Sequence, residues 1–282
     1  MMTLDLNRKL VLVTGGGRGI GLAISRAVAE AGADLAITYT SQDCSELARE
    51  LSGEFSITAK AFKCDTADSK EVDQSVQEIK KGFGKDVDIA ICNAGISLWR
   101  DSHDMSDAEL QHIFAVNAFG PIYTARALVR SWLGLPVCVD AEKHTALAEF
   151  KEKGRILQGK QVLFVSSISG LVAMSPQNQS AYNGSKAALT MMAKSLAGEW
   201  ASLGVTVNAI SPGYVSTDMI ANPPDAKAKA WVKEWQDRTP VGQFATAEMI
   251  GRFVALMVSD AAGGSGFLTG SDLIMDGGYT IF

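Results

Sequence analysis

The chain has 282 residues, of which 47% are hydrophobic and 20% charged, so it can bury a large core and is not typical of disordered proteins. Its net charge of −5, without any basic cluster, argues against a nucleic-acid-binding surface. No stretch of about 18 apolar residues and no leader-like N-terminus is present, so we expect a cytosolic protein without a membrane partner.

The cysteines and histidines do not form a metal or disulfide pattern. The four cysteines are far apart, with no Cys-x-x-Cys, and lie at Cys44, Cys64, Cys92 and Cys138. The three histidines show no ligand spacing. We therefore predict reduced, mostly buried thiols, no disulfide framework and no metal site.

The first predicted strand, Lys9–Thr14, is followed at once by a glycine-rich turn and by a helical pattern that stops at Gly32. Strand, turn and helix form the first half of a dinucleotide-binding unit. Gly15 permits the tight turn, Gly19 lets backbone N–H groups approach a pyrophosphate, and Gly21 lets helix and strand pack closely. A turn that binds no ligand is the alternative, but its place between a strand and a helix favours a nucleotide.

The second predicted strand, Asp34–Tyr39, ends without the acidic residue that binds the ribose hydroxyls of NAD. Thr40 and Ser41 follow it, so no carboxylate at this strand end repels a 2′-phosphate. Arg18 in the glycine turn can pair with such a phosphate. These residues predict NADP(H) rather than NAD(H). An ordinary surface or helix-capping residue is the alternative reading of Arg18.

Strands and helices continue to alternate, with predicted elements at Gln42–Leu51, Thr58–Cys64, Ser69–Phe83 and Val87–Cys92. This alternation predicts an α/β protein, a single-domain Rossmann fold with a doubly wound parallel β-sheet and helices on both faces. Asp65 and Asn93-Ala94-Gly95 follow two of the strands, at the sheet edge where such folds bind ligands. Asp65 either contacts an adenine or caps the next helix.

A long helix is predicted over Ser106–Trp132, with Asn117 in its middle among apolar neighbours. Asn is unfavourable inside a helix and a buried amide needs partners, so we expect a bend or a water-mediated contact there. The polar segment 134–159 is too short for a core of its own, and we expect it to be a surface excursion.

Tyr182 and Lys186 follow the fifth predicted strand, Gln161–Val165, in a run with helical composition. Their spacing places both side chains on one face of a helix. Because a neighbouring ammonium favours the phenolate, we expect a tyrosine that titrates closer to neutral pH and acts as an acid or base. An ordinary surface pair is the alternative.

The last predicted elements are a strand at Val205–Ile210, a helix at Ala247–Ser259 and a strand near Leu268–Met275. The proline-punctuated segment 213–242 carries Trp231 and Trp235 on a short amphipathic helix. We expect it to form a substrate lid, and core tryptophans are the alternative. One domain, 1–282, accounts for all elements.

These motifs resemble the short-chain dehydrogenase/reductase family over nearly the whole chain. The turn from Thr14 to Gly21 is similar to the family's Thr-Gly-x-x-x-Gly-x-Gly fingerprint, and Asn93-Ala94-Gly95 to its Asn-Asn-Ala-Gly motif, with Cys92 replacing the first Asn. The resemblance implies hydride transfer between a nicotinamide cofactor and a CH–OH or C=O group. The cofactor-binding residues that it implies are Gly15, Arg18, Gly19, Ile20, Gly21, Ser41, Asp65, Asn93, Ala94, Tyr182, Lys186, Pro212, Gly213, Val215 and Thr217.

The resemblance also implies four catalytic residues, Asn117, Ser167, Tyr182 and Lys186. Tyr182 would exchange a proton with the substrate oxygen, and Ser167 would hydrogen-bond that oxygen. Lys186 would hold the nicotinamide ribose and lower the pKa of the tyrosine, and Asn117 would position a water linking Lys186 to solvent. The connection before Tyr182 is longer than is usual in the family, which leaves Ser169 as an alternative to Ser167.

The segment Ser175–Asn183 resembles a run found in the sugar-alcohol members of the family, such as the sorbose and xylulose reductases and the arabinitol and mannitol dehydrogenases. Gln177, Asn178 and Gln179 would suit a polyhydroxylated substrate, because a site that bonds several hydroxyls rejects analogues without them. Lining or capping of a turn is the alternative role for these amides.

We therefore predict an NADP(H)-dependent oxidoreductase that interconverts an acyclic ketose and its sugar alcohol. The alternatives are a ketoreductase of the 3-oxoacyl or secondary-metabolite type and a non-catalytic nucleotide-sensing or scaffold protein. By analogy with the family, we expect a homotetramer or homodimer in which the Ser106–Trp132 and Tyr182 helices pair across a two-fold axis.

Overall fold

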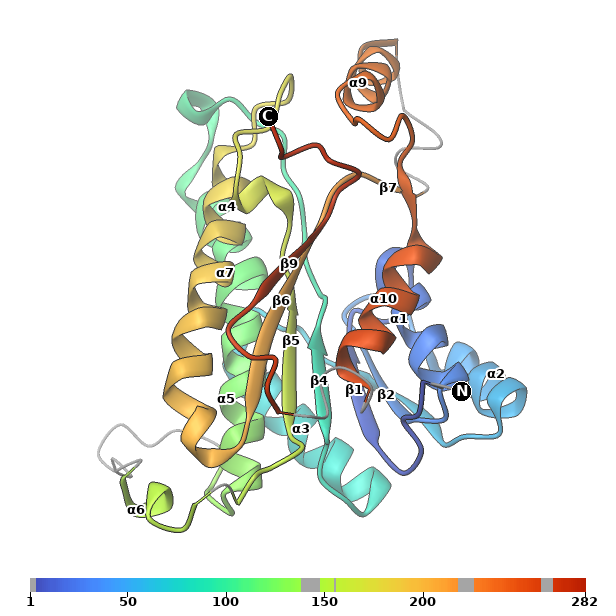
Figure 1. Cartoon of the computed structure of the whole chain (residues 1–282), viewed down its shortest axis with the longest axis vertical. Coiled ribbons are helices and arrows are strands. Elements are labelled where there is room, and N and C mark those ends of the chain that lie inside the picture. Colours follow the sequence, from blue (N-terminus) through green and yellow to red (C-terminus); the bar gives the residue numbers. More distant parts are fainter. Residues whose placement is uncertain (1–3, 138–147, 155, 218–225, 260–265) are drawn as a thin grey trace.

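The computed structural model describes residues 4–137, 148–154, 156–217, 226–259 and 266–282. Its centre is a seven-stranded parallel sheet with the order β3-β2-β1-β4-β5-β6-β9, between two layers of helices (Figure 1). The strands are β1 (Leu10–Thr14), β2 (Asp34–Tyr39), β3 (Ala59–Lys63), β4 (Ile89–Cys92), β5 (Gln161–Val165), β6 (Thr206–Pro212) and β9 (Asp272–Met275). The strand order reverses between β1 and β4, which is where such sheets open a ligand crevice. The predicted doubly wound Rossmann fold is confirmed.

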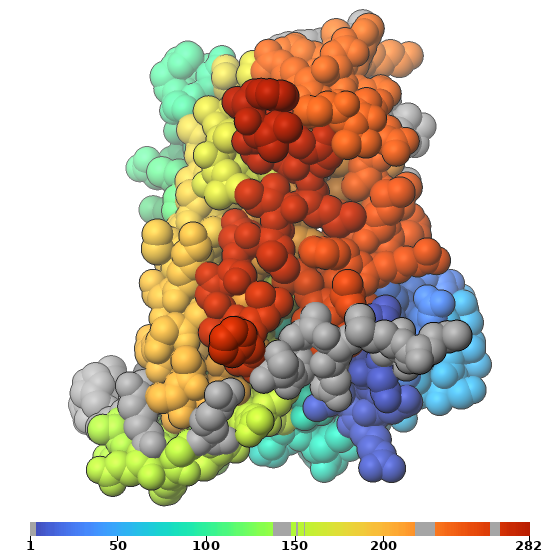
Figure 2. Space-filling model, viewed as in Figure 1, coloured from blue at the N-terminus to red at the C-terminus, as the bar shows by residue number. Residues whose placement is uncertain are grey.

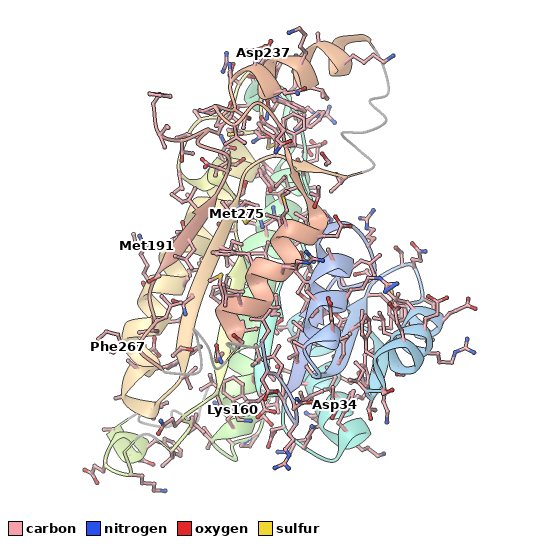
Figure 3. All side chains as sticks on the ribbon, turned by 45° about the vertical axis from the view of Figure 1, so that its right-hand side comes forward. Asp34, Lys160, Met191, Asp237, Phe267 and Met275 are labelled. Carbon is pink, nitrogen blue, oxygen red and sulfur yellow. The ribbon has the colours of Figure 1, made fainter. Side chains whose placement is uncertain are left out.

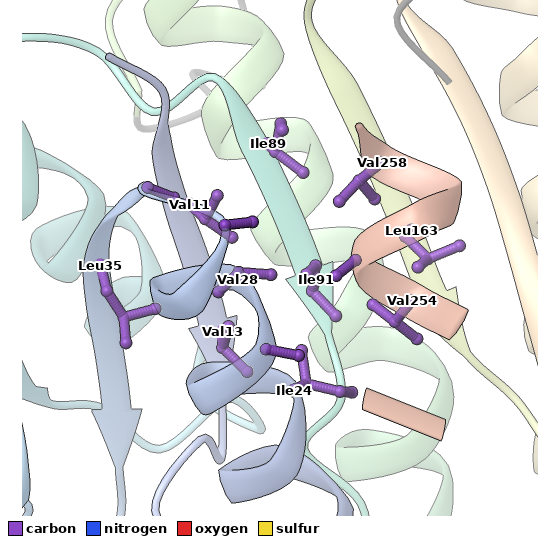
Figure 4. Close-up of a cluster of buried hydrophobic side chains, with 14 of the residues drawn as sticks. Val11, Val13, Ile24, Val28, Leu35, Ile89, Ile91, Leu163, Val254 and Val258 are labelled. Carbon is purple, nitrogen blue, oxygen red and sulfur yellow. The ribbon is translucent and has the colours of Figure 1, made fainter. Parts of the chain in front are cut away.

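One face of the sheet is covered by α1 (Gly19–Glu30), α2 (Ser45–Phe55) and α10 (Ala247–Val258). Alternate strand residues point to this face, so Val11 and Val13 of β1 are buried here. Figure 4 shows them in one cluster with helix side chains that include Ile24, Val28, Val254 and Val258. Burial of each such side chain contributes roughly 1.5–3 kcal/mol to folding.

The opposite face is covered by α3 (Ser69–Phe83), α5 (Gly120–Trp132) and α7 (Ser180–Trp200). Leu10 and Leu12 of β1 pack here with residues of α3 and α5. Central strands that are buried on both faces need apolar residues at successive positions, as in β4, where Ile89 to Cys92 are all apolar and buried.

The predicted long helix before the excursion is interrupted in its middle. The chain runs from α4 (Asp107–Phe114) through a π-helical turn, Ala115–Phe119, directly into α5. Asn117 lies in the π turn, so the helix is irregular where its sequence position suggested a bend or a water-mediated contact. Single π turns of this kind are frequent at functional sites.

The described part of segment 134–159 lies at the end of the sheet opposite the strand carboxyl ends (Figure 1). It includes α6 (Ala148–Lys151), and Leu157 is buried beside α7, so this part is anchored in the core. Residues 138–147 and 155 lie outside the described residues.

Near the other end, β7 (Val215–Ser216) and β8 (Ala245–Thr246) pair with each other, and α9 (Ala226–Asp237) stands beyond the carboxyl ends of the strands (Figure 1). The segment from 266 to the C-terminus runs as a strip between α7 and α10 (Figure 2). Short 3-10 turns complete the described elements, at Ser102–Asp104, Ile168–Gly170 and Ala201–Leu203.

Two further expectations concern side chains and membranes. Cys44, Cys64 and Cys92 are buried and free, as predicted, whereas Cys138 lies outside the described residues. Within the described part of the chain, every helix is too short or too polar to cross a bilayer.

Candidate functional site

The predicted site residues meet at the carboxyl edge of the sheet. The glycine turn follows β1, Ser41 follows β2, Asp65 follows β3, and Asn93 and Ala94 follow β4. Ser167 follows β5, and Pro212 to Thr217 end β6 and continue into β7. Because all these strands are parallel, their carboxyl ends share one edge, and residues far apart in sequence converge there.

The glycine turn packs too tightly for side chains at two positions. Gly15 has a φ of +62°, a conformation that residues with a Cβ rarely adopt. A Cβ at Gly21 would lie 2.2 Å from the carbonyl oxygen of Gly15, so only glycine lets α1 start this close to the turn. This close approach leaves the first backbone N–H groups of α1 available to an anion.

Thr14 and Asn93 hold the turn against β4. Thr14 Oγ1 accepts hydrogen bonds from the backbone N–H groups of Asn93 and Ala94, each at 3.0 Å. Asn93 Nδ2 donates to the carbonyl oxygens of Thr14 and Gly15, at 3.0 and 3.2 Å. The predicted cofactor residue Asn93 thus shapes the turn, and its partner is Thr14, which was not predicted to have a role of its own.

Two predicted cofactor segments face each other across the site. A Cβ added at Gly19 would lie 4.0 Å from Cγ2 of Thr217, so the glycine turn approaches the segment after β6. Gly213 in that segment donates its N–H to Met275 O, which ties it to β9. Ile20 packs on the core below the turn, and Val215 is buried in β7.

Arg18 and Ser41 are exposed beside the turn. Arg18 occupies the N-cap of α1, but its side chain makes no capping hydrogen bond and has no ion-pair partner among the described residues. The Arg18 side chain therefore does not cap the helix. A free guanidinium beside a glycine turn suits a phosphate.

Asp65 is not a helix cap. Its carboxylate accepts the N–H of Ala67 at 3.0 Å, whereas Asp68 is the N-cap of α3 and accepts from Lys70 and Glu71. Asp65 stabilises the turn after β3 and remains partly exposed at the sheet edge.

Tyr182 and Ser167 approach each other from different elements. Burial raises the pKa of Tyr182, and a hydrogen bond with the Ser167 side chain offsets part of that rise. This direction is opposite to the expected shift toward neutral pH, because removal of the phenol from water is the largest influence on its pKa.

Lys186 is 4% exposed, and burial lowers its pKa to about 8. Its Nζ donates to the carbonyl oxygen of Val165 at 2.8 Å and lies 5.9 Å from the centroid of the Tyr182 ring. The lysine is therefore close enough to favour the phenolate when charged, and it is close to losing that charge at physiological pH.

Asn117 is fully buried, and its side chain is extensively hydrogen-bonded. Nδ2 donates to Ile96 O at 2.9 Å and to Ser185 Oγ at 3.1 Å, and Oδ1 accepts from Ile96 N at 2.9 Å. A Cβ added at Gly95 would lie 3.3 Å from this Oδ1 and 3.5 Å from Lys186 Nζ. Both atoms therefore lie close to Gly95 and near each other.

Ser169 is placed differently from Ser167. Its Oγ is buried and accepts a hydrogen bond from Gln179 Nε2 at 3.1 Å, while Ser167 Oγ accepts the N–H of Ser169 at 3.1 Å and contacts Tyr182. Of the two serines, Ser167 is the one beside the tyrosine.

The three amides before Tyr182 are bonded mainly within the protein. Gln177 donates to Tyr214 Oη and accepts from Trp235 Nε1, both at 2.9 Å, and Gln179 donates to Ser169 and Asn183. Asn178 bonds Asp101. The turn-lining alternative thus describes most of their hydrogen bonds, although all three amides also line a polar pocket.

That pocket has a volume of about 480 Å³ and is lined by Asp101, Ser102, His103, Met174, Gln177, Asn178, Gln179, Ser180 and Asn183. Only Met174 among these residues is apolar. At the exposed rim of the pocket, carboxylate oxygens of Asp101 and Asp104 and an imidazole nitrogen of His103 lie within 4.8 Å of one another. These are atoms of the kind that bind metal ions, and the spacing of the histidines in the sequence does not indicate this cluster.

The two tryptophans of the predicted lid differ: one is buried in the core, and the other is partly exposed, as a lid residue would be. Trp235 is 2% exposed and stacks on Tyr214, with ring centroids 4.6 Å apart, so it belongs to the core. Trp231 is partly exposed and meets Trp99 edge to face at 5.5 Å. Residues 218–225 of the predicted lid lie outside the described residues.

Comparison with known proteins places this geometry in a family. The family model for short chain dehydrogenase matches residues 9–228. A sorbose reductase of Candida albicans is 36% identical over 98% of this chain and 88% of its own length. An NADP-dependent mannitol dehydrogenase of Hypocrea jecorina is 34% identical over 98% of this chain and 94% of its own length.

A solved structure shows the same architecture. The NADPH-dependent 3-quinuclidinone reductase of Rhodotorula rubra superposes with a TM-score of 0.80 and 28% identity, covering 99% of this chain and 94% of its own. The names of these relatives agree with the prediction of NADP(H) from Arg18 and Ser41. The chain therefore belongs to the short-chain dehydrogenase/reductase family and is an oxidoreductase.

Proposed function

We propose that this protein is an NADP(H)-dependent oxidoreductase that interconverts an acyclic ketose and its sugar alcohol. The observation that carries the proposal is the contact between Tyr182 and Ser167, with Lys186 on the same helix face, at the sheet edge that also holds the glycine turn. The relatives named sorbose reductase and NADP-dependent mannitol dehydrogenase support this substrate class.

The residues present fit a dinucleotide phosphate cofactor. Gly21 lets α1 begin directly against the turn, with its first N–H groups toward an anion, and the free Arg18 side chain supplies a cation for a 2′-phosphate. Gly15, Gly19 and Ile20 would hold the pyrophosphate, and Asp65 and Ser41 the adenosine end. Asn93, Ala94 and the segment Pro212–Thr217 would border the nicotinamide end.

The chemistry follows from the neighbours of Tyr182. When bound, the cofactor supplies or accepts the hydride. During ketose reduction Tyr182 donates its hydroxyl proton to the substrate oxygen, and Ser167 hydrogen-bonds that same oxygen. The charged Lys186 stabilises the phenolate that forms, and its ammonium also binds ribose hydroxyls. A water held between Lys186 and Asn117 would return the proton from solvent.

A polyhydroxylated substrate suits the surroundings of the tyrosine. The polar pocket lies beside the N-terminal turn of α7, where Asn178, Ser180 and Asn183 offer amide and hydroxyl groups. A ketoreductase for 3-oxoacyl or aromatic substrates is the second candidate, and the partly exposed Trp99 and Trp231 favour it.

We also propose a homotetramer or homodimer through α4, α5 and α7. Phe119 in the π turn between α4 and α5 and Met191 on α7 have 42% and 61% of their surfaces exposed, and Met191 points away from the body in Figure 3. Burial of such side chains between copies would be favourable.

The test is the initial rate of NADPH and NADH oxidation with fructose, sorbose, xylulose and ribulose, beside a β-ketoester and an aromatic ketone. Rates confined to the ketoses with NADPH support the proposal. Turnover of only the ketoester or the aromatic ketone would rule out the ketose/polyol substrate class and favour the ketoreductase. Tyr182→Phe should abolish turnover while NADPH still binds, and persistent turnover in that variant would discard the acid/base assignment.

A further inference from the structure

Ser185 connects two residues of the proposed catalytic group that do not touch each other. Its Oγ donates to the backbone carbonyl of Tyr182 at 2.8 Å and accepts from Asn117 Nδ2 at 3.1 Å. The directions are fixed by chemistry, since an amide nitrogen only donates and a carbonyl only accepts. The buried Ser185 hydroxyl therefore links, by two hydrogen bonds, the π turn to the first turn of α7, which carries Tyr182.

Asn117 is itself a fixed reference point. Its other two hydrogen bonds go to the backbone N–H and C=O of Ile96, in the loop after β4, and the side chain is fully buried. Both Nδ2 hydrogens are used, so the amide cannot turn without leaving a buried group unpaired. Ser185 is also fully buried, so water cannot take the place of its hydroxyl bonds.

Several other side chains hold the start of α7, but they bond the strand and loop of β5. Gln179, the N-cap, bonds Ser169 in the loop after β5, and Lys186 Nζ bonds Val165 O of β5. Ser166 Oγ donates to Lys186 O at 3.1 Å and pairs with Thr190 Oγ1 at 2.8 Å, so this contact also ties α7 to β5. Ser185 supplies the matching contact toward the π turn. Rotation of the first turns of α7 would move the Tyr182 hydroxyl relative to Ser167.

We propose that Ser185 is a positioning residue, which transfers the fixed position of Asn117 to Tyr182 and so holds the tyrosine hydroxyl against Ser167. The proposal rests on the proposed function only in giving Tyr182 its role as acid and base. It assigns to Asn117 a mechanical task in addition to any contact with water.

The test compares Ser185→Ala with Ser195→Ala. Ser195 lies on the same helix, and its Oγ bonds a helix carbonyl, Met191 O, at 3.1 Å, but it is exposed and does not contact Asn117. We expect Ser185→Ala to lower kcat by about tenfold or more with little change in the KM for NADPH. Ser185→Thr, which keeps the hydroxyl, should recover part of the loss. Ser195→Ala should match the wild type.

A pH profile separates positioning from a general loss of structure. If Tyr182 leaves Ser167, it loses the hydrogen bond that lowers its pKa, so the tyrosine limb of the rate profile should move to higher pH in Ser185→Ala. A lower rate with an unmoved profile, equal to the drop in folded protein, would overturn the proposal.

A double-mutant cycle in urea tests the link without any substrate. Once Asn117→Ala has removed the donor, adding Ser185→Ala should change the unfolding midpoint less than it does in the wild type. Additive effects of the two substitutions would show that Asn117 and Ser185 are not coupled, and this would refute the positioning role of Ser185 even if the enzyme reduces ketoses. Coupled effects in a protein that reduces none of the carbonyls would refute the proposed function alone.

Discussion

The indole N–H of Trp235 donates to Gln177 Oε1 at 2.9 Å, and this bond joins α9 to the loop after β5. Gln177 is 3% exposed, and its Nε2 donates to Tyr214, which stacks on the same indole. The amide of Gln177, which its polarity suggested would bind a sugar, is therefore hydrogen-bonded to Trp235 of α9 and to Tyr214. Docking of α9 depends on it.

Trp235→Phe should therefore destabilise the protein. Phenylalanine keeps most of the stacking surface but leaves Gln177 Oε1 buried without that donor, which lowers the free energy of unfolding by about 1–3 kcal/mol. Urea unfolding followed by circular dichroism measures the change. Trp99→Phe is the control, because that indole N–H has no hydrogen-bond partner among the described residues. Equal stability of both variants would mean that the bond contributes nothing.

Arg18→Ala should weaken NADPH binding about 10- to 100-fold and leave NADH binding nearly unchanged, because only NADPH carries the 2′-phosphate. Quenching of protein fluorescence gives both dissociation constants without turnover. Arg26→Ala is the control on the same helix, where the arginine forms an exposed ion pair with Glu54 at 2.7 Å. Equal losses for the two cofactors would show that Arg18 does not contact the 2′-phosphate.

Ser167→Ala should lower kcat by about 10²- to 10³-fold, the usual cost of losing a hydrogen bond to the reacting oxygen. Ser169→Ala should retain most of its activity and lose stability instead, since Gln179 Nε2 loses a buried acceptor. Steady-state rates and melting temperatures of the two variants separate these effects. The reverse order of activities would place Ser169 at the substrate.

Ketose reduction should decline as the pH rises through about 8, the pKa to which burial lowers Lys186. The ammonium that stabilises the forming phenolate is lost above this pKa, while Tyr182, whose pKa is raised by burial, still carries its proton. The profile of kcat/KM for NADPH between about pH 6 and pH 10 reports these groups in the free protein. Lys194→Gln is the control at an exposed position of α7, and its rate should decline above about pH 8 as in the wild type. A level profile across this range would contradict the role of Lys186.

The sequence predicts the sheet well because most strands are short, largely apolar and bounded by polar residues or glycine. The first two strands and the fifth lie within one residue of their predicted bounds. The helix predicted from Gln42 begins at Ser45 instead, because Asp43 accepts the N–H and hydroxyl of Ser45 and ends the preceding loop. A local hydrogen bond of this kind moves a boundary without changing the pattern of hydrophobic residues.

For the site, the sequence predicts which residues converge but not how they are paired. The positions of Tyr182, Lys186 and Asn117 follow from helix spacing and strand ends. The raised pKa of Tyr182 depends on burial by several elements, and the partner of Gln177 lies on α9. Neither property is visible in the sequence around the residue itself.

The bonds that shape the site join residues that are far apart in the chain. Thr14 and Asn93 are 79 residues apart, Asn117 and Ser185 are 68 apart, and Gln177 and Trp235 are 58 apart. Contacts with long sequence separation form late, after local helices. During refolding, activity should therefore return after the helical signal has recovered. A nascent chain that lacks β6 and α9 would not yet have a working site, so the enzyme becomes active only when almost all of it has been made.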